Sequence, residues 1–370
     1  MKTKAAVLWE LGKDWDVVEL DLDPPKEGEV LIRFVAAGLC HSDEHLRHGD
    51  IVPRFPIVGG HEGAGVIEEV GPGVSRVKPG DHVVCSFIPS CGFCRWCATG
   101  HENLCDWGAF ILEGCLPDQT FRFHSGDNDL GSMCMLGTFS QWSTISETSC
   151  VKVDDDFDLE TAVLVGCGVP TGWGSAVYAA EVEPGDTVAI YGIGGIGINA
   201  VQGARAAGAT HIVAIDPLAN KREMAEQLGA THAVADAGEA QELVMQLTRG
   251  VGADKSIVTV DIVNEGVVQA GFDIIRKGGT EVITGLADPT KQTVQLSGAM
   301  MTLFEKTVKG SLFGSGNPMR EIPKMLALYR AGDLKLDELI TRKYKLDEVN
   351  QGYDDLLAGK NVRGVLVHEH

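Results

Sequence analysis

One turn constrains the fold of this chain more than any other segment. The stretch DTVAIYGIGGIG (186–197) places Gly192, Gly194 and Gly197 in the spacing G-x-G-x-x-G, directly after an apolar run that predicts a buried strand. A second apolar run, HIVAID, ends at Asp216, nineteen residues after Gly197. A strand, a glycine turn, a helix and a second strand ending in an acidic residue together predict a doubly wound parallel sheet of the Rossmann type.

The glycine turn also predicts what binds there. Its backbone N–H groups, at the positive N-terminus of the following helix, suit the pyrophosphate of a dinucleotide. The carboxylate of Asp216 can accept hydrogen bonds from both adenosine ribose hydroxyls and would repel a 2′-phosphate, so NAD(H) is favoured over NADP(H). A simple helix cap is the competing interpretation of Asp216. The turn residues expected at the cofactor are Gly192, Gly194, Gly195, Ile196 and Gly197.

Strand and helix patterns divide the chain into two parts. From about residue 170, apolar strands alternate with helical stretches, which predicts parallel strands joined by right-handed crossovers. Two further strands are expected at 256–261 and 280–285. The earlier part has short alternating runs between glycine and proline turns and predicts a mainly β region. Those runs lie at 29–37, 65–70 and 82–88.

The end of the chain returns to the mainly β pattern of the first part. A helix is expected near 318–331, and RGVLVH predicts a closing strand. We therefore expect one domain from residues 1–170 and 313–370, and a Rossmann domain over 171–312. The fold class is α/β.

Charge and hydropathy exclude some partners. The chain of 370 residues has 31 basic and 52 acidic side chains and a net charge of −21, which disfavours nucleic acid. No apolar run approaches the roughly 18 residues of a membrane helix, and the N-terminal segment lacks the pattern of a signal peptide. We expect a cytoplasmic protein that does not bind membranes. All ten cysteines lie between Cys40 and Cys167, and in a reducing compartment such clustering indicates metal rather than disulfides.

Four of these cysteines occur within fifteen residues, in CGFCRWCATGHENLC. Cys91, Cys94, Cys97 and Cys105 can close a tetrahedron around Zn²⁺ with no vacant position, so a structural zinc site is predicted. An iron–sulfur cluster is the alternative on ligand type, but the tight spacing suits mononuclear zinc better.

A second ligand set leaves a position open. GLCHSDEH offers Cys40, GGHEGAG offers His61 and Glu62, and GCGVPTG offers Cys167. Two thiolates and one imidazole leave a fourth zinc position for water or an alcohol. Taken singly, a buried Cys is usually only a small apolar residue. The glycines that flank these residues and the cofactor fold that follows favour a catalytic metal.

These motifs together resemble a known family. GHEGAGVIEEVGPGV matches the zinc alcohol dehydrogenase signature G-H-E-x2-G-x5-G-x2-V, upstream of the four-cysteine loop and the glycine turn. The whole chain resembles the zinc-dependent medium-chain alcohol dehydrogenases. VPRFPIVGGHEGAG, TFRFHSGD and VGCGVPTGWGSA are most similar to the actinobacterial nicotinoprotein enzymes, which retain NAD and pass electrons to an acceptor such as nitrosodimethylaniline.

The resemblance implies an activity and an architecture. It implies a GroES-like catalytic domain, homo-oligomers, one catalytic and one structural Zn²⁺ per chain, and NAD(H). The reaction expected is the oxidation of a primary alcohol to an aldehyde, and its reverse, by hydride transfer assisted by zinc. An external electron acceptor is a further expected partner.

The resemblance also implies residue roles. Cys40, His61 and Cys167 would bind the catalytic zinc, with Glu62 in its outer sphere and Asp43 orienting His61. Ser42 would take the alcohol proton and pass it through ribose hydroxyls to His45 and then to solvent. The residues expected at the cofactor, besides the glycine turn and Asp216, are His41, Thr171, Lys221 and Arg363, and Phe87 would line the alcohol pocket.

Alternatives remain at this stage. A thiol-adduct formaldehyde dehydrogenase of the same superfamily needs a basic residue after the structural zinc loop; 106–121 has none, although Arg122 follows. A non-catalytic zinc- and nucleotide-binding homologue would be expected to lack Ser42 or a zinc ligand, and none is missing. Ser42 could be only a helix cap, and His45 only an exposed helix residue. No chemistry is expected of the remaining cysteines, Cys85, Cys115, Cys134 and Cys150.

Overall fold

The computed structural model describes residues 1–287 and 293–370 and divides the chain into two compact units. Unit 1 contains residues 1–167 and 317–370, and unit 2 contains residues 168–316. The chain therefore leaves unit 1 directly after Cys167 and returns to it at Asn317. The sequence led us to expect these crossings three residues later and four residues earlier, respectively.

Unit 2 is built on a parallel sheet, as the sequence predicts; the sheet has six strands, four of which were predicted from the sequence. The order of its strands corresponds to 3-2-1-4-5-6 in sequence, the order of a dinucleotide-binding sheet. Along the sheet the strands are β13 (His232–Val234), β12 (His211–Ile215), β11 (Thr187–Tyr191), β14 (Ala253–Val258), β16 (Ile275–Ile283) and β18 (Thr307–Gly310). Every residue of β11 is buried, because a parallel strand in the middle of a sheet is covered on both faces.

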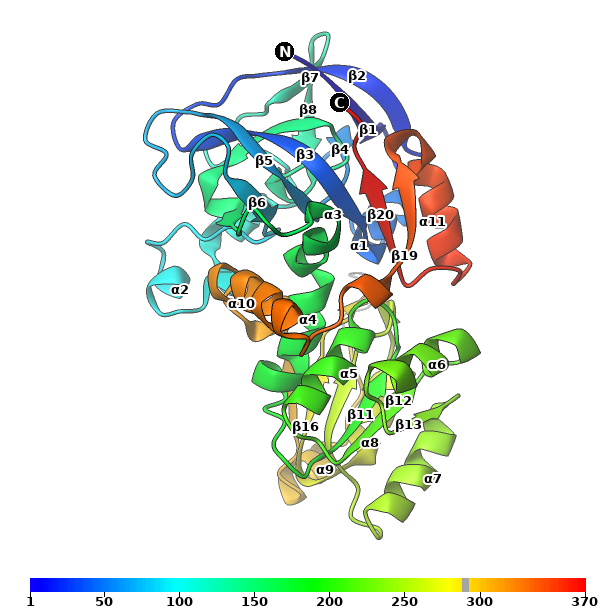
Figure 1. Cartoon of the computed structure of the whole chain (residues 1–370). Helices are drawn as coiled ribbons and strands as arrows, with labels where there is room; N and C mark the ends of the chain where they lie inside the picture. The colour runs from blue at the N-terminus through cyan, green and yellow to red at the C-terminus, as the bar shows by residue number, and fades with distance from the viewer. Residues whose placement is uncertain (288–292) are drawn as a thin grey trace. The chain divides into compact units, whose positions relative to one another are not determined.

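Helices connect these strands (Figure 1). They are α5 (Gly197–Ala206), α6 (Ala219–Leu228), α7 (Ala237–Leu247), α8 (Glu265–Ile274) and α9 (Gly298–Leu303), and a further helix, α4 (Gly168–Gly174), precedes β11. A short parallel pair, β15 (Ile262–Val263) and β17 (Leu286–Ala287), lies outside the main sheet. The order of the strands reverses between β11 and β14, so the ends of these two strands mark the point where such sheets bind ligands.

Unit 1 is mainly β. A closed barrel joins β1 (Lys2–Leu8), β2 (Asp16–Leu22), β7 (Phe123–Ser125), β8 (Asn128–Ser132) and β4 (Ile57–Val58). The second sheet contains β10 (Cys150–Lys152), β6 (His82–Cys85), β5 (Gly63–Val70), β3 (Glu29–Leu39), β20 (Arg363–Val367) and β19 (Ile340–Lys345), and β9 (Trp142–Ser146) also pairs with β3. Its helices are α1 (His41–His48), α2 (Arg95–Ala98), α3 (Leu159–Ala162), α10 (Pro318–Ala331) and α11 (Val349–Leu357). The predicted α/β fold class is confirmed.

The last segment of the chain completes this second sheet. In Figure 1 the red strand β20 runs beside the blue strand β3. The two strands are antiparallel, with Gly364 opposite Leu39 and Val367 opposite Ala36. The closing strand expected from the sequence is therefore β20. It pairs with β3, the strand that Cys40 follows directly.

Local signals explain the helix that begins this return. Asn317 caps α10 by accepting a hydrogen bond from the Met319 N–H over 2.9 Å, and Pro318 occupies the first turn. Gly332 ends the helix in the left-handed conformation, with φ of 83°. The predicted bounds, 318–331, agree with the structure. Two elements between this helix and β20, namely β19 and α11, were not predicted.

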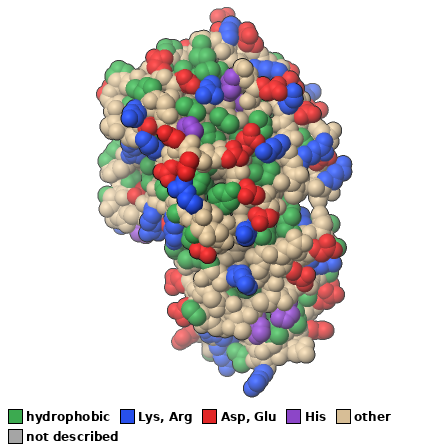
Figure 2. All heavy atoms as spheres, viewed as in Figure 1, with side chains coloured by type: hydrophobic (Ala, Val, Ile, Leu, Met, Phe, Trp, Pro, Cys, Tyr) green, Lys and Arg blue, Asp and Glu red, His purple; other side chains and the backbone are tan. Residues whose placement is uncertain are grey.

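The distribution of charged side chains and the lengths of the apolar helices are what the charge and hydropathy of the sequence lead one to expect. On the face shown in Figure 2, acidic and basic side chains are interspersed, and no large patch of Lys and Arg is visible. Within the described residues, no single helix is long and apolar enough to cross a membrane. One bent pair, 159–166 with 168–179, meets that test by length and composition only.

Candidate functional site

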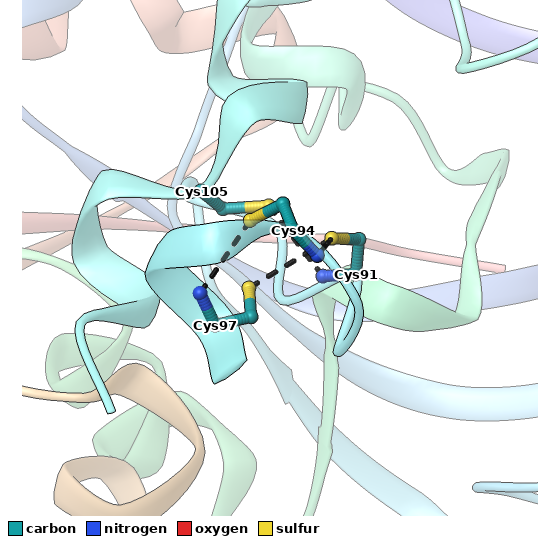
Figure 3. A group of neighbouring side chains, drawn as sticks. All are labelled: Cys91, Cys94, Cys97 and Cys105. Carbon is teal, nitrogen blue, oxygen red and sulfur yellow. Dashed lines mark hydrogen bonds between the residues drawn. The ribbon is translucent and has the colours of Figure 1, made fainter. Parts of the chain in front are cut away.

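The four clustered cysteines meet in one loop of unit 1 (Figure 3). All four side chains are buried, and their Sγ atoms lie within 4.8 Å of one another. The backbone N–H groups of Cys94 and Cys97 point to the Sγ atoms of Cys91 and Cys94, each over 3.4 Å. The N–H of Cys91 lies 3.5 Å from the Sγ of Cys105. None of the ten cysteines, all of which are described, forms a disulfide.

The chemistry of this loop fits Zn²⁺. Burial raises the pKa of Cys94, but hydrogen bonds from the N–H groups of Cys97 and Asp106 outweigh it and lower that pKa to about 6. Burial raises the pKa of Cys97 and of Cys105 above the ordinary value of a thiol. A bound cation is therefore what would hold all four sulfurs as thiolates. Four sulfur ligands fill a tetrahedron, which makes this a structural site rather than one that binds a substrate.

A second donor set lies at the ends of three other segments of unit 1. Cys40 connects β3 to α1, His61 and Glu62 lie between β4 and β5, and Cys167 directly precedes α4. One ligand atom from each of these four residues lies within 4.8 Å of the others, and all four residues are buried. The structure therefore brings together Cys40, His61 and Cys167, residues separated by up to 127 positions in the sequence.

The state of these donors also suits a metal. The thiol of Cys167 donates toward Cys40 and lowers the pKa of Cys40 well below its ordinary value, although burial opposes this effect. The Nε2 atom of His61 is buried and has no hydrogen-bond partner among the described residues. A buried, unpaired imidazole nitrogen is costly unless a ligand occupies it. Two sulfurs and one nitrogen are the donor set of a zinc site with an open position.

The other nitrogen of His61 faces a carboxylate. The Nδ1 atom lies 3.1 Å from Asp43 Oδ2, and both side chains are almost completely buried. Asp43 Oδ1 accepts a hydrogen bond from the Gly60 N–H over 2.9 Å, which fixes the carboxylate. This is the carboxylate–histidine arrangement that directs the opposite ring nitrogen toward a metal.

Glu62 is fully buried next to the same donors. The guanidinium of Arg363 contacts Glu62 Oε2, and Glu62 Oε1 has no hydrogen-bond partner among the described residues. Burial raises the pKa of Glu62 to about 7, although the charge of Arg363 opposes this effect. The resemblance implies that Arg363 lies near the cofactor pyrophosphate; in this structure its Nη2 contacts Glu62, and its buried Nε has no hydrogen-bond partner among the described residues.

The proton-relay candidates lie on α1. Ser42 is its second residue, and its Oγ lies 3.6 Å from the Sγ of Cys40. Cys40, not Ser42, is the residue at the helix cap, so the interpretation of Ser42 as a cap is wrong. The interpretation of His45 as an exposed helix residue is also wrong, because only 6% of its side chain is exposed. His41 is the first residue of α1 and is half-buried, and Phe87 packs edge-on against the His61 ring, with centroids 5.8 Å apart.

The glycine turn of unit 2 has the features of a pyrophosphate site. A Cβ at Gly197 would lie 1.9 Å from the carbonyl oxygen of Gly192, so only glycine lets α5 begin this close to β11. A Cβ at Gly194 would meet nothing within 4 Å, which leaves that side of the turn open for a ligand. Both observations fit the roles of these positions in a dinucleotide fingerprint.

Asp216 follows β12 at the same edge of the sheet. Its Oδ2 accepts a hydrogen bond from the Ile193 N–H over 2.8 Å, and its Oδ1 accepts one from the Leu218 N–H over 2.9 Å. Leu218, not Asp216, is the residue at the N-terminal cap of α6, and that helix has no side-chain cap hydrogen bond, so the interpretation of Asp216 as a simple helix cap is wrong. A carboxylate held at the turn, with further lone pairs available, fits a ribose with two free hydroxyls.

Two more residues that the resemblance implies at the cofactor are Lys221 and Thr171. In the described part of the chain, Lys221 makes no hydrogen bond with Asp216. The neighbouring Arg222 donates instead to the backbone carbonyls of Asp216 and Pro217, over 2.8 and 2.9 Å. Thr171 lies in α4, where its buried Oγ1 has no hydrogen-bond partner among the described residues.

Arg122, the residue that kept a formaldehyde dehydrogenase open as an alternative, is fully buried. Its Nε donates to Glu29 Oε2 and its Nη2 to Asp118 Oδ2, both over 2.8 Å. This guanidinium is therefore engaged by two carboxylates of its own chain. Of the unassigned cysteines, Cys85 and Cys134 have a pKa raised to about 12 by burial, which makes them unreactive thiols.

Comparison with known proteins places these sites in context. Residues 26–155 match the family described as alcohol dehydrogenase GroES-like domain, and residues 195–331 match zinc-binding dehydrogenase. The chain is 66% identical over 368 residues to the NDMA-dependent alcohol dehydrogenase of Amycolatopsis methanolica, covering 100% of this chain and 99% of the relative. It is 64% identical to a putative alcohol dehydrogenase D of Mycobacterium tuberculosis, with both chains covered completely.

Solved structures agree in fold. A benzyl alcohol dehydrogenase from Acinetobacter calcoaceticus superposes with a TM-score of 0.93 at 29% identity, with 100% of both chains covered. An alcohol dehydrogenase zinc-binding domain protein from Burkholderia ambifaria gives a TM-score of 0.94 at 30% identity, again over both whole chains.

Proposed function

Because this chain belongs to the zinc-dependent medium-chain alcohol dehydrogenases, it oxidises alcohols with Zn²⁺ and NAD(H), and we propose that it converts primary alcohols to aldehydes on an NAD that stays bound between turnovers. The donor set of Cys40, His61 and Cys167 carries the catalytic part of this proposal, because it leaves a coordination position open. The relative named NDMA-dependent, at 66% identity, supports the second part.

The residues of unit 1 would prepare the alcohol. A Zn²⁺ bound by these residues would supply the Lewis acidity that favours loss of the alcohol proton, and a bound NAD⁺ would supply the hydride acceptor. Cys40, His61 and Cys167 hold the metal, and Asp43 keeps Nε2 of His61 directed at it. Glu62 and Arg363 compensate each other's charge in the same buried region, so neither leaves an unpaired charge beside the reacting alcohol.

Ser42 and His45 would carry the proton away. Ser42 Oγ accepts the hydroxyl proton of the alcohol while giving its own proton onward, and His45 receives that proton near the end of the helix. Both residues lie on one rigid helix that begins directly after a metal ligand, which fixes their distance from the alcohol. A base whose pKa ordinarily lies near neutrality is suited to this step.

The residues of unit 2 would bind the cofactor. The turn from Gly192 to Gly197 offers backbone N–H groups to the pyrophosphate, and Asp216 accepts from the ribose hydroxyls. Arg222 holds the backbone around Asp216 and therefore supports that carboxylate from the main chain. Cytoplasmic location and assembly into homo-oligomers are further parts of the proposal that rest on the family.

Cofactor retention can be tested directly. Purified protein is denatured and the released nicotinamide is quantified, and native protein is mixed with benzyl alcohol without added NAD. We expect about one nicotinamide per chain, a stoichiometric rise in the absorbance of the reduced form, and bleaching of that absorbance by nitrosodimethylaniline. Turnover that requires added NAD⁺, from protein that carries none, would make the enzyme an ordinary dehydrogenase that exchanges its cofactor.

The formaldehyde alternative is not favoured, and the same assay separates it. Arg122 cannot bind the carboxylate of a thiol adduct without losing Glu29 and Asp118. S-(hydroxymethyl)glutathione should therefore give a kcat/KM no higher than that of benzyl alcohol. A strong preference for the adduct would require a carboxylate-binding residue elsewhere in the chain and would reverse this assignment.

A further inference from the structure

The end of α1 brings a second carboxylate to the proton-relay helix. The sequence there is HLRHGD (45–50), in which a glycine follows the last helical residue. Gly49 adopts the left-handed conformation, with φ of 89°, and its N–H donates to the His45 carbonyl over 3.0 Å. The Ile51 N–H donates to the same carbonyl over 3.2 Å, so the chain turns back over the last turn of the helix.

This turn places Asp50 against His45. Asp50 Oδ2 lies 2.8 Å from His45 Nδ1, at hydrogen-bond distance. The histidine side chain is 6% exposed and the aspartate side chain 31% exposed, so the contact leads from the interior of unit 1 to its surface. A glycine with positive φ is what allows the reversal, because a side chain there would be strained and would also lie 3.0 Å from Leu11.

The chemistry of the pair determines which nitrogen can act as a base. A carboxylate only accepts hydrogen bonds, so the contact requires the proton of neutral His45 to be on Nδ1. The lone pair of the ring is then on Nε2, so Nε2 is the nitrogen that can accept a proton. A histidine whose second nitrogen is held by a carboxylate is the arrangement by which other enzymes fix the tautomer and direction of a general base.

We propose that Asp50 is a positioning residue for the proton relay: it fixes His45 in the tautomer and orientation that accept the proton from the alcohol. The proposal rests on the relay role proposed above for His45. The two acidic residues of α1 itself, Asp43 and Glu44, face other partners. Asp43 lies against His61, and Glu44 lies 3.0 Å from Arg47 Nε and from His48 Nδ1.

A kinetic double-mutant cycle tests this. The zinc-loaded enzyme, saturated with NAD⁺, is mixed with benzyl alcohol in a stopped-flow instrument, and the first turnover is followed as absorbance of reduced nicotinamide, in H₂O and in D₂O. The variants are Asp50→Asn, Asp50→Glu, His45→Gln and the double variant Asp50→Asn with His45→Gln. Asp14→Asn is the matched control, because Asp14 contacts Arg47 of the same helix, over 3.3 Å, and is 80% exposed.

We expect Asp50→Asn to slow the first turnover about tenfold, with an unchanged KM for alcohol and a larger solvent isotope effect, because proton release becomes limiting. Asp50→Glu should recover most of the rate, and Asp14→Asn should match the wild type. The double variant should be no slower than His45→Gln alone, because Asp50 acts through that histidine.

Each contrary result has its own meaning. If His45→Gln keeps the full rate, the proposed relay role of His45 is wrong and the inference is lost with it. If His45→Gln is slow but Asp50→Asn is not, the relay stands and the role of Asp50 is wrong. If Asp50→Asn slows the wild-type enzyme and the His45→Gln variant by the same factor, its effect is a general structural one, and this result would also overturn the inference.

Discussion

At the scale of single residues, Asp216 determines more than one property of unit 2. Its carboxylate accepts hydrogen bonds from the N–H groups of Ile193 and Leu218, so the group that would recognise the ribose also orders the glycine turn. Hydrogen bonds to a charged group contribute about 2 kcal/mol, or roughly thirtyfold in affinity. Loss of this side chain should therefore weaken NAD⁺ binding even where the sheet is unchanged.

We predict that Asp216→Ala raises the Kd for NAD⁺ about thirtyfold and shifts the preference toward NADP⁺, because the carboxylate no longer repels a 2′-phosphate. Titrations of cofactor-free protein with NAD⁺ and with NADP⁺ measure the ratio of the two Kd values. Asp254→Asn is the control, since Asp254 also accepts a backbone N–H, that of Thr187 over 2.8 Å, but at the opposite end of the strands. An unchanged NAD⁺/NADP⁺ ratio in Asp216→Ala would show that this carboxylate does not face the ribose.

The sequence indicates residue types better than it indicates their contacts. The pairing of Asp43 with His61 was expected from the resemblance to the zinc alcohol dehydrogenases, and the structure places the two side chains 3.1 Å apart. Asp50 was not expected, since its contact with His45 depends on the left-handed turn at Gly49. Arg222 was also missed, because nothing in the letters KR at 221–222 tells which side chain faces the carbonyls of Asp216 and Pro217.

At the scale of elements, the two cysteine sites should respond differently to mutation. The buried apolar cluster at the four-cysteine loop consists of Ile88 and the cysteines themselves, with Phe87, Trp107 and Ile111 packed against it. Because four of its five buried members are the metal ligands, we expect the conformation of the loop to depend on the metal. Cys167, in contrast, lies among buried segments of unit 1 whose strands pair without it.

We predict that Cys97→Ser lowers the melting temperature by about 10 °C or causes aggregation, because the structural zinc contributes folding free energy directly. Cys167→Ser should keep the melting temperature within about 3 °C and lose alcohol oxidation. Differential scanning fluorimetry and the benzyl alcohol assay measure these outcomes. A Cys97→Ser variant that is stable and fully active would contradict the structural role of the loop.

Besides Glu62 in unit 1, a buried carboxylate in the sheet of unit 2 has a raised pKa. Glu281, on β16, is completely buried, and neither carboxylate oxygen has a hydrogen-bond partner among the described residues. Burial raises its pKa to about 8, the charge of Asp273 adds to this effect, and that of Lys306 opposes it. Because the folded pKa is raised, the stabilising contribution is complete below the ordinary pKa of about 4.5 and is lost as pH rises through about 8.

We therefore expect the melting temperature of the protein to fall between pH 6 and pH 9, and Glu281→Gln to reduce that fall by about 5 °C. Thermal unfolding across this range measures the difference. The exposed Glu223→Gln serves as the control and should follow the wild type. Identical pH profiles for wild type and Glu281→Gln would show that the carboxyl group of Glu281 is already ionised in the folded protein at pH 6.

Long elements were easier to predict than short ones. The helix at 318–331 has a side-chain cap, an N-terminal proline and a C-terminal glycine, so its bounds could be read from the sequence. The strand expected at 82–88 ends at Cys85, and the one expected at 256–261 is β14, which begins at Ala253 and ends at Val258. These ends depend on which neighbouring strands are available for pairing, and the sequence of one segment does not contain that information.

At the scale of the whole molecule, two separate donor sets imply two metal ions in one chain. We predict that elemental analysis gives about two Zn²⁺ per chain for the wild type and about one for Cys167→Ser. Inductively coupled plasma mass spectrometry on protein purified without chelators makes this measurement. A reproducible value of one for the wild type would rule out one of the two sites.

A ribosome makes β20 only after all of unit 2 has been synthesised, although β20 belongs to the sheet of unit 1. Until then the nascent chain has Glu62 without the guanidinium of Arg363, and the end of β3 near Leu39 without its antiparallel neighbour. Unit 2 is contiguous in the chain and can fold as soon as it emerges. The order of folding should therefore be the reverse of the order of translation, with the cofactor unit complete before the metal unit that the ribosome began first.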